Sequence, residues 1–205
     1  MPEWYTEARL PALTAAETHW LLSRGSLTVQ LKALSAAVAP PPDGAAAFTV
    51  RVLAEGWRPL AADERAALER PAAADAPGWV REVQLCGPGG TPWVAARTVA
   101  LATALAGAAA GGGPPVTLCS LGERPLGAVL FDRDSPFVRG PIAVTRMTEA
   151  ALLQLHGDAG GEDGAHWTRR SLFRDDARGL SVLVAELFTP AFWSAVAQAE
   201  GGERL

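Results

Sequence analysis

The sequence has few of the residues that build metal centres and disulfides. Its 205 residues include two cysteines, Cys86 and Cys119, and three histidines, and the cysteines form no C-x-x-C pair. Protein zinc sites need a cluster of such ligands at short spacing. We therefore expect no metal site, and we expect both cysteines to be small buried side chains rather than a redox pair.

Basic residues are also few. Lysine and arginine together number 18 against 22 acidic residues, which gives a net charge of -4, and Lys32 is the one lysine. Proteins that bind nucleic acid usually carry a basic patch that contacts the phosphates. The charge balance therefore argues against a nucleic-acid partner.

Long apolar runs are missing. A membrane-spanning helix needs roughly 18 or more apolar residues, and the nearest candidate, residues 94–113, is interrupted by Arg97 and by glycines. The first seventeen residues contain three glutamates and no apolar segment of the kind found in signal peptides. We expect a cytoplasmic protein without stable membrane insertion.

Several familiar catalytic motifs are absent as well. The chain has no G-x-S-x-G, no P-loop, and no G-x-G-x-x-G after a predicted strand. These absences argue against the common serine-hydrolase and nucleotide-dependent mechanisms. A function has to come from other side chains.

The length and the apolar fraction of 49% indicate one domain with a substantial core, spanning residues 1–205. We expect residues 1–12 and 194–205 to be flexible ends. Thr14 and Glu17 have the spacing of a capping box, which predicts a helix over residues 15–24. A second helix is predicted from Leu27, Leu31 and Leu34, which recur at helical spacing.

Strand patterns dominate the rest of the chain. "WVREVQLC" and "TPWVAARTVAL", on either side of "GPGG", predict an antiparallel hairpin. Further strands are predicted at residues 48–54 and 142–146 and on both sides of "DDARG", with a short helix near Pro125. Without alternating strands and helices, the fold class is α+β, with a single antiparallel β-sheet and flanking helices.

Three charged residues lie within apolar strand patterns. Arg81 shares its side of a strand with Trp79 and Val83, Arg97 lies in the second hairpin strand, and Glu186 interrupts "LSVLVAELF". Whether the two arginines face the same side depends on the hairpin register, which the sequence leaves open. The pattern fits either an internal ion pair or a closed pocket for a small carboxylate ligand.

Four blocks together resemble the chorismate pyruvate-lyase family, in the order that the family has. They are "WLLSRGSLT", "VREVQLCGPGGTPWVAARTV", "LGERPLGAVLF" and "RRSLFRDDARGLSVLVAELFTPAFW". The resemblance implies a lyase of bacterial ubiquinone biosynthesis that converts chorismate into 4-hydroxybenzoate and pyruvate without a cofactor. It also implies a chorismate lyase-like fold with helical flaps over a buried ligand site, here around Gly25 and residues 125–131.

The resemblance assigns roles to individual residues. It implies that Arg81 holds the ring carboxylate and that Glu186 meets the ring hydroxyl, so we expect these two to be the catalytic residues. Leu126 would contact the product through its backbone, and Leu27 would be an apolar lid residue. Arg97 would lie beside the ligand path as a further binding residue.

The same fold allows one alternative function. Ligand-sensing domains of some bacterial transcription regulators resemble the same fold, so a sensor that binds a small carboxylate without turnover is the alternative. Such sensors normally follow a winged helix, for which the residues before Trp20 are too few. We expect an enzyme that acts as a monomer.

Overall fold

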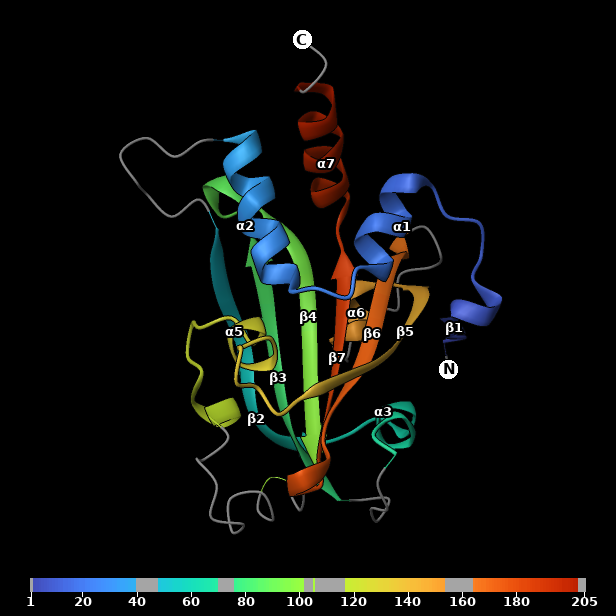
Figure 1. The fold of residues 1–205 in the computed structure, drawn as a ribbon, viewed down its shortest axis with the longest axis vertical. Coiled ribbons are helices and arrows are strands. Elements are labelled where there is room, and N and C mark those ends of the chain that lie inside the picture. Colours follow the sequence, from blue (N-terminus) through green and yellow to red (C-terminus); the bar gives the residue numbers. More distant parts are fainter. Residues whose placement is uncertain are drawn as a thin grey trace.

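The computed structural model describes residues 2–39, 48–69, 76–101, 105, 117–153 and 164–202. Within them lies one sheet of seven strands in the order β1-β5-β6-β7-β4-β3-β2, and every neighbouring pair is antiparallel (Figure 1). The predicted α+β class with a single antiparallel sheet is confirmed. The strands are β1 (Tyr5–Thr6), β2 (Thr49–Pro59), β3 (Pro77–Cys86), β4 (Pro92–Leu101), β5 (Val138–Met147), β6 (His166–Asp175) and β7 (Leu180–Phe188).

Helices flank this sheet. Thr14 and Glu17 form the predicted capping box, in which each side chain bonds the backbone N–H of the other residue. That cap satisfies N–H groups that would otherwise lack partners at the helix start. The helices are α1 (Ala15–Leu22), α2 (Leu27–Val38), α3 (Ala62–Ala67), α5 (Gly127–Leu130), α6 (Glu149–Leu152) and α7 (Pro190–Gly202).

The two faces of the sheet bear different helices. The face that carries Arg81 and Val184, called the cavity face below, packs against α1, α2, α5 and α7. The opposite face, called the back face, carries Val99 and Leu183 and packs against α3 and α6. In Figure 1, α1 and α2 lie in front of the upper half of the sheet and α3 lies beside its lower end.

The sequence analysis missed regular structure at both ends of the chain and shortened one strand. Helix α7, which the sequence analysis treated as a tail, covers residues 190–202, and Phe192 packs edge-to-face on Trp20 with ring centroids 4.9 Å apart. At the other end, Tyr5–Thr6 pair with β5. Strand β2 continues to Pro59 rather than ending near residue 54, because a register shift between Val52 and Ala54 hides its alternation.

The structure also describes the two cysteines and the lengths of the helices. Both cysteines are free; Cys86 is buried as expected, whereas Cys119 is exposed, contrary to the prediction. No helix in the described ranges is long and apolar enough to cross a membrane. The glycine-rich loop at residues 107–115 lies outside the described residues.

Candidate active site

Arg81 stands near the middle of β3 and points to the cavity face. It is 2% exposed, and its guanidinium pairs with Glu55, the residue opposite it on β2. Its Nη2 donates to the backbone carbonyls of Gly122 at 2.7 Å and Arg124 at 3.3 Å. These bonds fix the plane of the guanidinium while one edge of the side chain borders the cavity.

Glu186 projects from β7 onto the same face. Its partner is Arg169, which lies directly opposite on β6, with 2.7 Å between Arg169 Nε and Glu186 Oε2. Arg169 is 1% exposed, and its Nη1 donates to the carbonyls of Trp20 at 2.7 Å and Ser23 at 3.2 Å. Glu186 Oε1 accepts no hydrogen bond from the described residues, so this oxygen is available to a ligand in the cavity.

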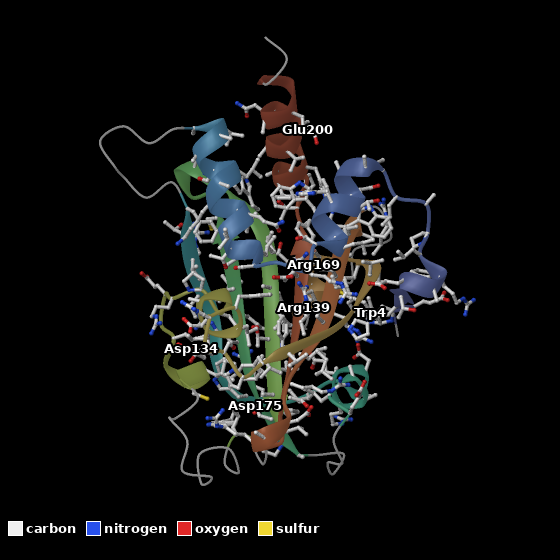
Figure 2. The ribbon with its side chains drawn as sticks, in the orientation of Figure 1. Trp4, Asp134, Arg139, Arg169, Asp175 and Glu200 are labelled. Carbon is white, nitrogen blue, oxygen red and sulfur yellow. The ribbon has the colours of Figure 1, made fainter. Side chains whose placement is uncertain are left out.

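A third arginine, Arg139 of β5, reaches the same cavity. Its Nε donates to Ser171 Oγ and its Nη1 to the carbonyl of Ser23, each at 3.0 Å. Burial, followed by the neighbouring charge of Arg169, lowers the pKa of Arg139 to about 10, so the group stays cationic at neutral pH. Figure 2 shows the labelled side chains of Arg139 and Arg169 near the centre of the sheet.

Arg139 was missed by the sequence analysis. Strand β5 was predicted to begin near Ile142, and the pairing with β6 shifts register between Arg139 and Ile142. A position before such an irregularity cannot be assigned to a face by counting alternate residues. Arg169 and Arg170 are adjacent on β6 and therefore point to opposite faces of the sheet; Arg169 lines the cavity and Arg170 faces the back.

The cavity between the sheet and the helices has a volume of about 50 Å³. Four of the five residues that the sequence analysis singled out line it, namely Arg81, Glu186, Leu27 and Leu126. The rest of its wall is mainly apolar, which excludes water and strengthens electrostatic interactions inside. The further lining residues are Thr28, Val50, Val83, Leu85, Ala96, Thr98, Pro125, Gly127, Leu130, Phe131, Arg139, Arg169, Phe173 and Val184.

Two segments close this cavity, and they match the predicted flap candidates. Flap 1, residues 20–28, joins α1 to α2 and contributes Leu27; flap 2, residues 121–131, contains α5 and contributes Leu126. Each flap is tied to the sheet by arginines that line the cavity, flap 1 through Arg139 and Arg169 and flap 2 through Arg81.

The two flaps meet each other at a glycine. A Cβ at Gly127 of flap 2 would lie 2.9 Å from Thr28 Oγ1 and 3.0 Å from Ser26 Oγ, both in flap 1. Distances this short require the neighbouring atoms to move. Glycine at position 127 therefore allows the flaps to close together.

Arg97 is not at the cavity, and its expected place beside the ligand path is corrected. Arg81 pairs with Thr98 in the β3–β4 register, which puts Arg97 on the back face. There it is 3% exposed; its Nε donates to Glu64 Oε1 at 2.7 Å, and its Nη1 pairs with Glu82. The hairpin register, which the sequence left open, decided this outcome.

The described residues contain no group of three or more His, Cys, Asp and Glu side chains placed to hold a metal ion. The functional groups that the cavity offers are guanidiniums, one carboxylate with a free oxygen, and an apolar wall. Such a set suits the orientation of a small, multiply charged organic anion.

Known proteins resemble the chain over almost its whole length. The family model described as chorismate lyase matches residues 2–198. A probable chorismate pyruvate-lyase of Pseudomonas aeruginosa is 41% identical over 190 residues, covering 93% of this chain and 92% of that protein. One from Pseudomonas putida is 44% identical over 176 residues, covering 86% and 81%.

Solved structures are more distant. The C-terminal domain of the histidine utilization repressor from Pseudomonas syringae pv. tomato aligns with a TM-score of 0.46 and 11% identity, over 70% of this chain and 92% of that domain. That similarity is too weak to support an inference about this chain.

Proposed function

The chain belongs to the chorismate lyase family, and from this premise we propose that it converts chorismate into 4-hydroxybenzoate and pyruvate for ubiquinone biosynthesis. The observation that carries the proposal is the closed, largely apolar cavity into which Arg81 and Glu186 both project. A carboxylate-binding group and a hydroxyl-binding group in one small cavity match the two ends of a hydroxybenzoate. The names of the relatives, probable chorismate pyruvate-lyases, support the same substrate.

The proposed pose follows from the available donors and acceptors. The ring carboxylate binds Arg81, whose guanidinium is held in place by the Gly122 carbonyl and borders the cavity. The ring hydroxyl at C4 donates to Glu186 Oε1, the oxygen that Arg169 leaves unused. Leu27 and Leu126 cover the ring from the two flaps.

The reaction needs little covalent help from the protein. The bond between ring C3 and the ether oxygen breaks, and its electron pair leaves with enolpyruvate. The hydrogen at C4 is lost and its bonding electrons complete the aromatic ring, while enolpyruvate gains a proton at its methylene carbon and becomes pyruvate. The site contributes orientation, exclusion of water and fixed positive charge near the leaving group.

Two routes for the C4 hydrogen give different roles to Glu186. As a general base, Glu186 would remove the hydrogen as a proton; in a concerted transfer within the substrate, it would orient the hydroxyl alone. Chorismate deuterated at C4 separates these routes. Deuterium in the methyl group of pyruvate indicates internal transfer, and its loss to solvent indicates the general base.

The function itself is tested by incubating the purified protein with chorismate, without added metal or nucleotide. We expect 4-hydroxybenzoate and pyruvate in equal amounts, measured by chromatography and a coupled lactate dehydrogenase assay. Consumption of chorismate without these products would refute the proposal. Binding without consumption would favour the sensor.

The closed flaps also suggest that product release is slow. Because both flaps are bonded to arginines within the cavity, 4-hydroxybenzoate can leave only after a flap moves. We expect a pre-steady-state burst of 4-hydroxybenzoate equal to the enzyme concentration. Linear product formation from time zero would contradict this.

A further inference from the structure

The cavity contains more positive than negative charge. Three arginines line it, and two of them have carboxylate partners: Arg81 pairs with Glu55, and Arg169 pairs with Glu186. Arg139 has no carboxylate partner in the described part of the chain. A largely buried cation without a counter-ion is costly, which makes Arg139 a candidate for binding an anionic ligand.

The donors of Arg139 are used in part. Its Nε and Nη1 bond to neutral acceptors, Ser171 Oγ and the Ser23 carbonyl, and its Nη2 donates to no other described residue. The guanidinium carbon lies 5.4 Å from the ring centroid of Phe173 and 5.9 Å from that of Phe131, which hold the side chain in place. One N–H edge of a fixed guanidinium thus remains free at the cavity.

Arg139 also lies next to the pair that would hold the ring hydroxyl. Arg139 and Arg169 donate to the same carbonyl, that of Ser23, at 3.0 and 3.2 Å, and Arg169 is bonded to Glu186. In chorismate the enolpyruvyl ether is on C3, the ring carbon next to the hydroxyl-bearing C4. When the C4 hydroxyl is at Glu186, the carboxylate of the enolpyruvyl group falls in the part of the cavity that Arg139 borders.

We propose that Arg139 binds the enolpyruvyl carboxylate of chorismate, the carboxylate that departs with pyruvate. This inference rests on the proposed function and adds the residue that recognises the leaving group. As the C3–O bond breaks, negative charge develops on the enolpyruvate oxygen next to this carboxylate. A guanidinium already in place stabilises that charge without reorganisation.

The proposed contact with Arg139 exists in the substrate, chorismate, and is absent in the product. 4-Hydroxybenzoate retains the ring carboxylate and the hydroxyl and lacks the carboxylate assigned to Arg139. Arg139→Gln should therefore lower kcat/KM for chorismate by about 100-fold or more and leave the Kd for 4-hydroxybenzoate within about threefold. Arg81→Gln is the matched control, because it should weaken turnover and product binding together.

A second experiment tests the contact between Arg139 and this carboxylate by ligand binding alone, without turnover. The ligands are 3-(carboxymethoxy)-4-hydroxybenzoate and an analogue in which only the ether-linked carboxylate is replaced by a primary amide. Calorimetry measures the binding of each to the wild type and to the Arg139→Gln variant. Arg139→Gln should weaken binding of the acid by at least tenfold and change binding of the amide little, since mutant cycles isolate the pairwise term. Arg139→Lys should restore part of the loss, because it keeps the charge without the planar fork.

The outcomes distinguish failure of the proposed lyase function from failure of the role assigned to Arg139. A wild type that leaves chorismate unchanged refutes the proposed function. A wild type that turns over chorismate, with normal kcat/KM in Arg139→Gln, refutes the role of Arg139 alone. The role of Arg139 would also be overturned by a loss of 4-hydroxybenzoate affinity in Arg139→Gln, or by equal losses for the acid and the amide. Binding of 4-hydroxybenzoate by this variant shows that its site is folded.

Discussion

Two arginines on opposite faces of one sheet, the buried Arg97 and the half-buried Arg139, have contrasting surroundings. Burial lowers the pKa of Arg97 on the back face, but its contacts with two carboxylates, Glu64 and Glu82, outweigh this, so its pKa is raised. Arg139 on the cavity face contacts a hydroxyl and a carbonyl, and burial lowers its pKa. The protein itself neutralises Arg97 and leaves the charge of Arg139 uncompensated.

This contrast shows how a buried ion can be assigned a role. Arg97 lies away from the cavity and has two carboxylate partners from the same chain, so it is part of the folded structure, and removing it takes a buried cation away from both carboxylates. A cation that the chain leaves without a counter-ion is suited to an external one. The partners of the two guanidiniums, carboxylates for Arg97 and neutral acceptors for Arg139, distinguish these two cases.

The largest effect should come from replacing Arg97, whose charge the protein itself neutralises. Arg97→Met leaves Glu64 and Glu82 facing an apolar side chain and should cost about 3–5 kcal/mol of unfolding free energy, measured by urea denaturation. Arg58→Met is the control, because Arg58 also pairs with Glu82 but is 47% exposed; it should cost less than about 1 kcal/mol. Equal losses in the two variants would show that the back-face network is not what stabilises the fold.

On the cavity side, Glu186→Gln keeps the shape of the side chain and removes its charge. We expect kcat for chorismate to fall about 100-fold, since the amide is a poorer acceptor and cannot serve as a base. The effect is read from initial rates of 4-hydroxybenzoate formation, with circular dichroism to confirm folding. A kcat within threefold of the wild type would remove Glu186 from the catalytic site.

A smaller effect concerns how the cavity face is covered. Gly127→Ala puts a methyl group against Thr28 and Ser26 and should push the flaps apart, raising the dissociation rate of 4-hydroxybenzoate several-fold. Gly25→Ala is the matched control within flap 1, since its Cβ would meet nothing closer than 3.9 Å. Stopped-flow displacement measures both, and equal rates in the two variants would contradict the contact.

The smallest effect should be a pH dependence at the edge of flap 1. Burial raises the pKa of Glu17, but hydrogen bonds from the Thr14 N–H and the Trp167 indole outweigh it, so the folded pKa is lower than the ordinary value. The stability from Glu17 is therefore present above the unfolded pKa and lost as pH falls through the folded one. Glu17→Gln should flatten this part of the stability curve below about pH 4.5, measured by urea unfolding at several pH values; an unchanged slope would contradict the assignment.

The sequence predicted the fold class, and four of the five residues that it singled out line the cavity. Strict alternation placed Arg81 and Glu186 in apolar strand patterns, and capping residues marked the start of α1. What it could not supply was register. Arg97 was misplaced because one residue of hairpin register reverses a face, and Arg139 was missed because the β5–β6 pairing is irregular beside it.

The arginines of the cavity also hold its covers, since Arg81 donates to the Gly122 and Arg124 carbonyls of flap 2, and Arg139 and Arg169 donate to flap 1. When a flap lifts, these guanidiniums lose carbonyl acceptors at the moment the cavity opens. Opening a flap therefore breaks hydrogen bonds made by the same side chains that line the cavity, so the arginines placed to meet an anion also resist the opening of the cavity around it.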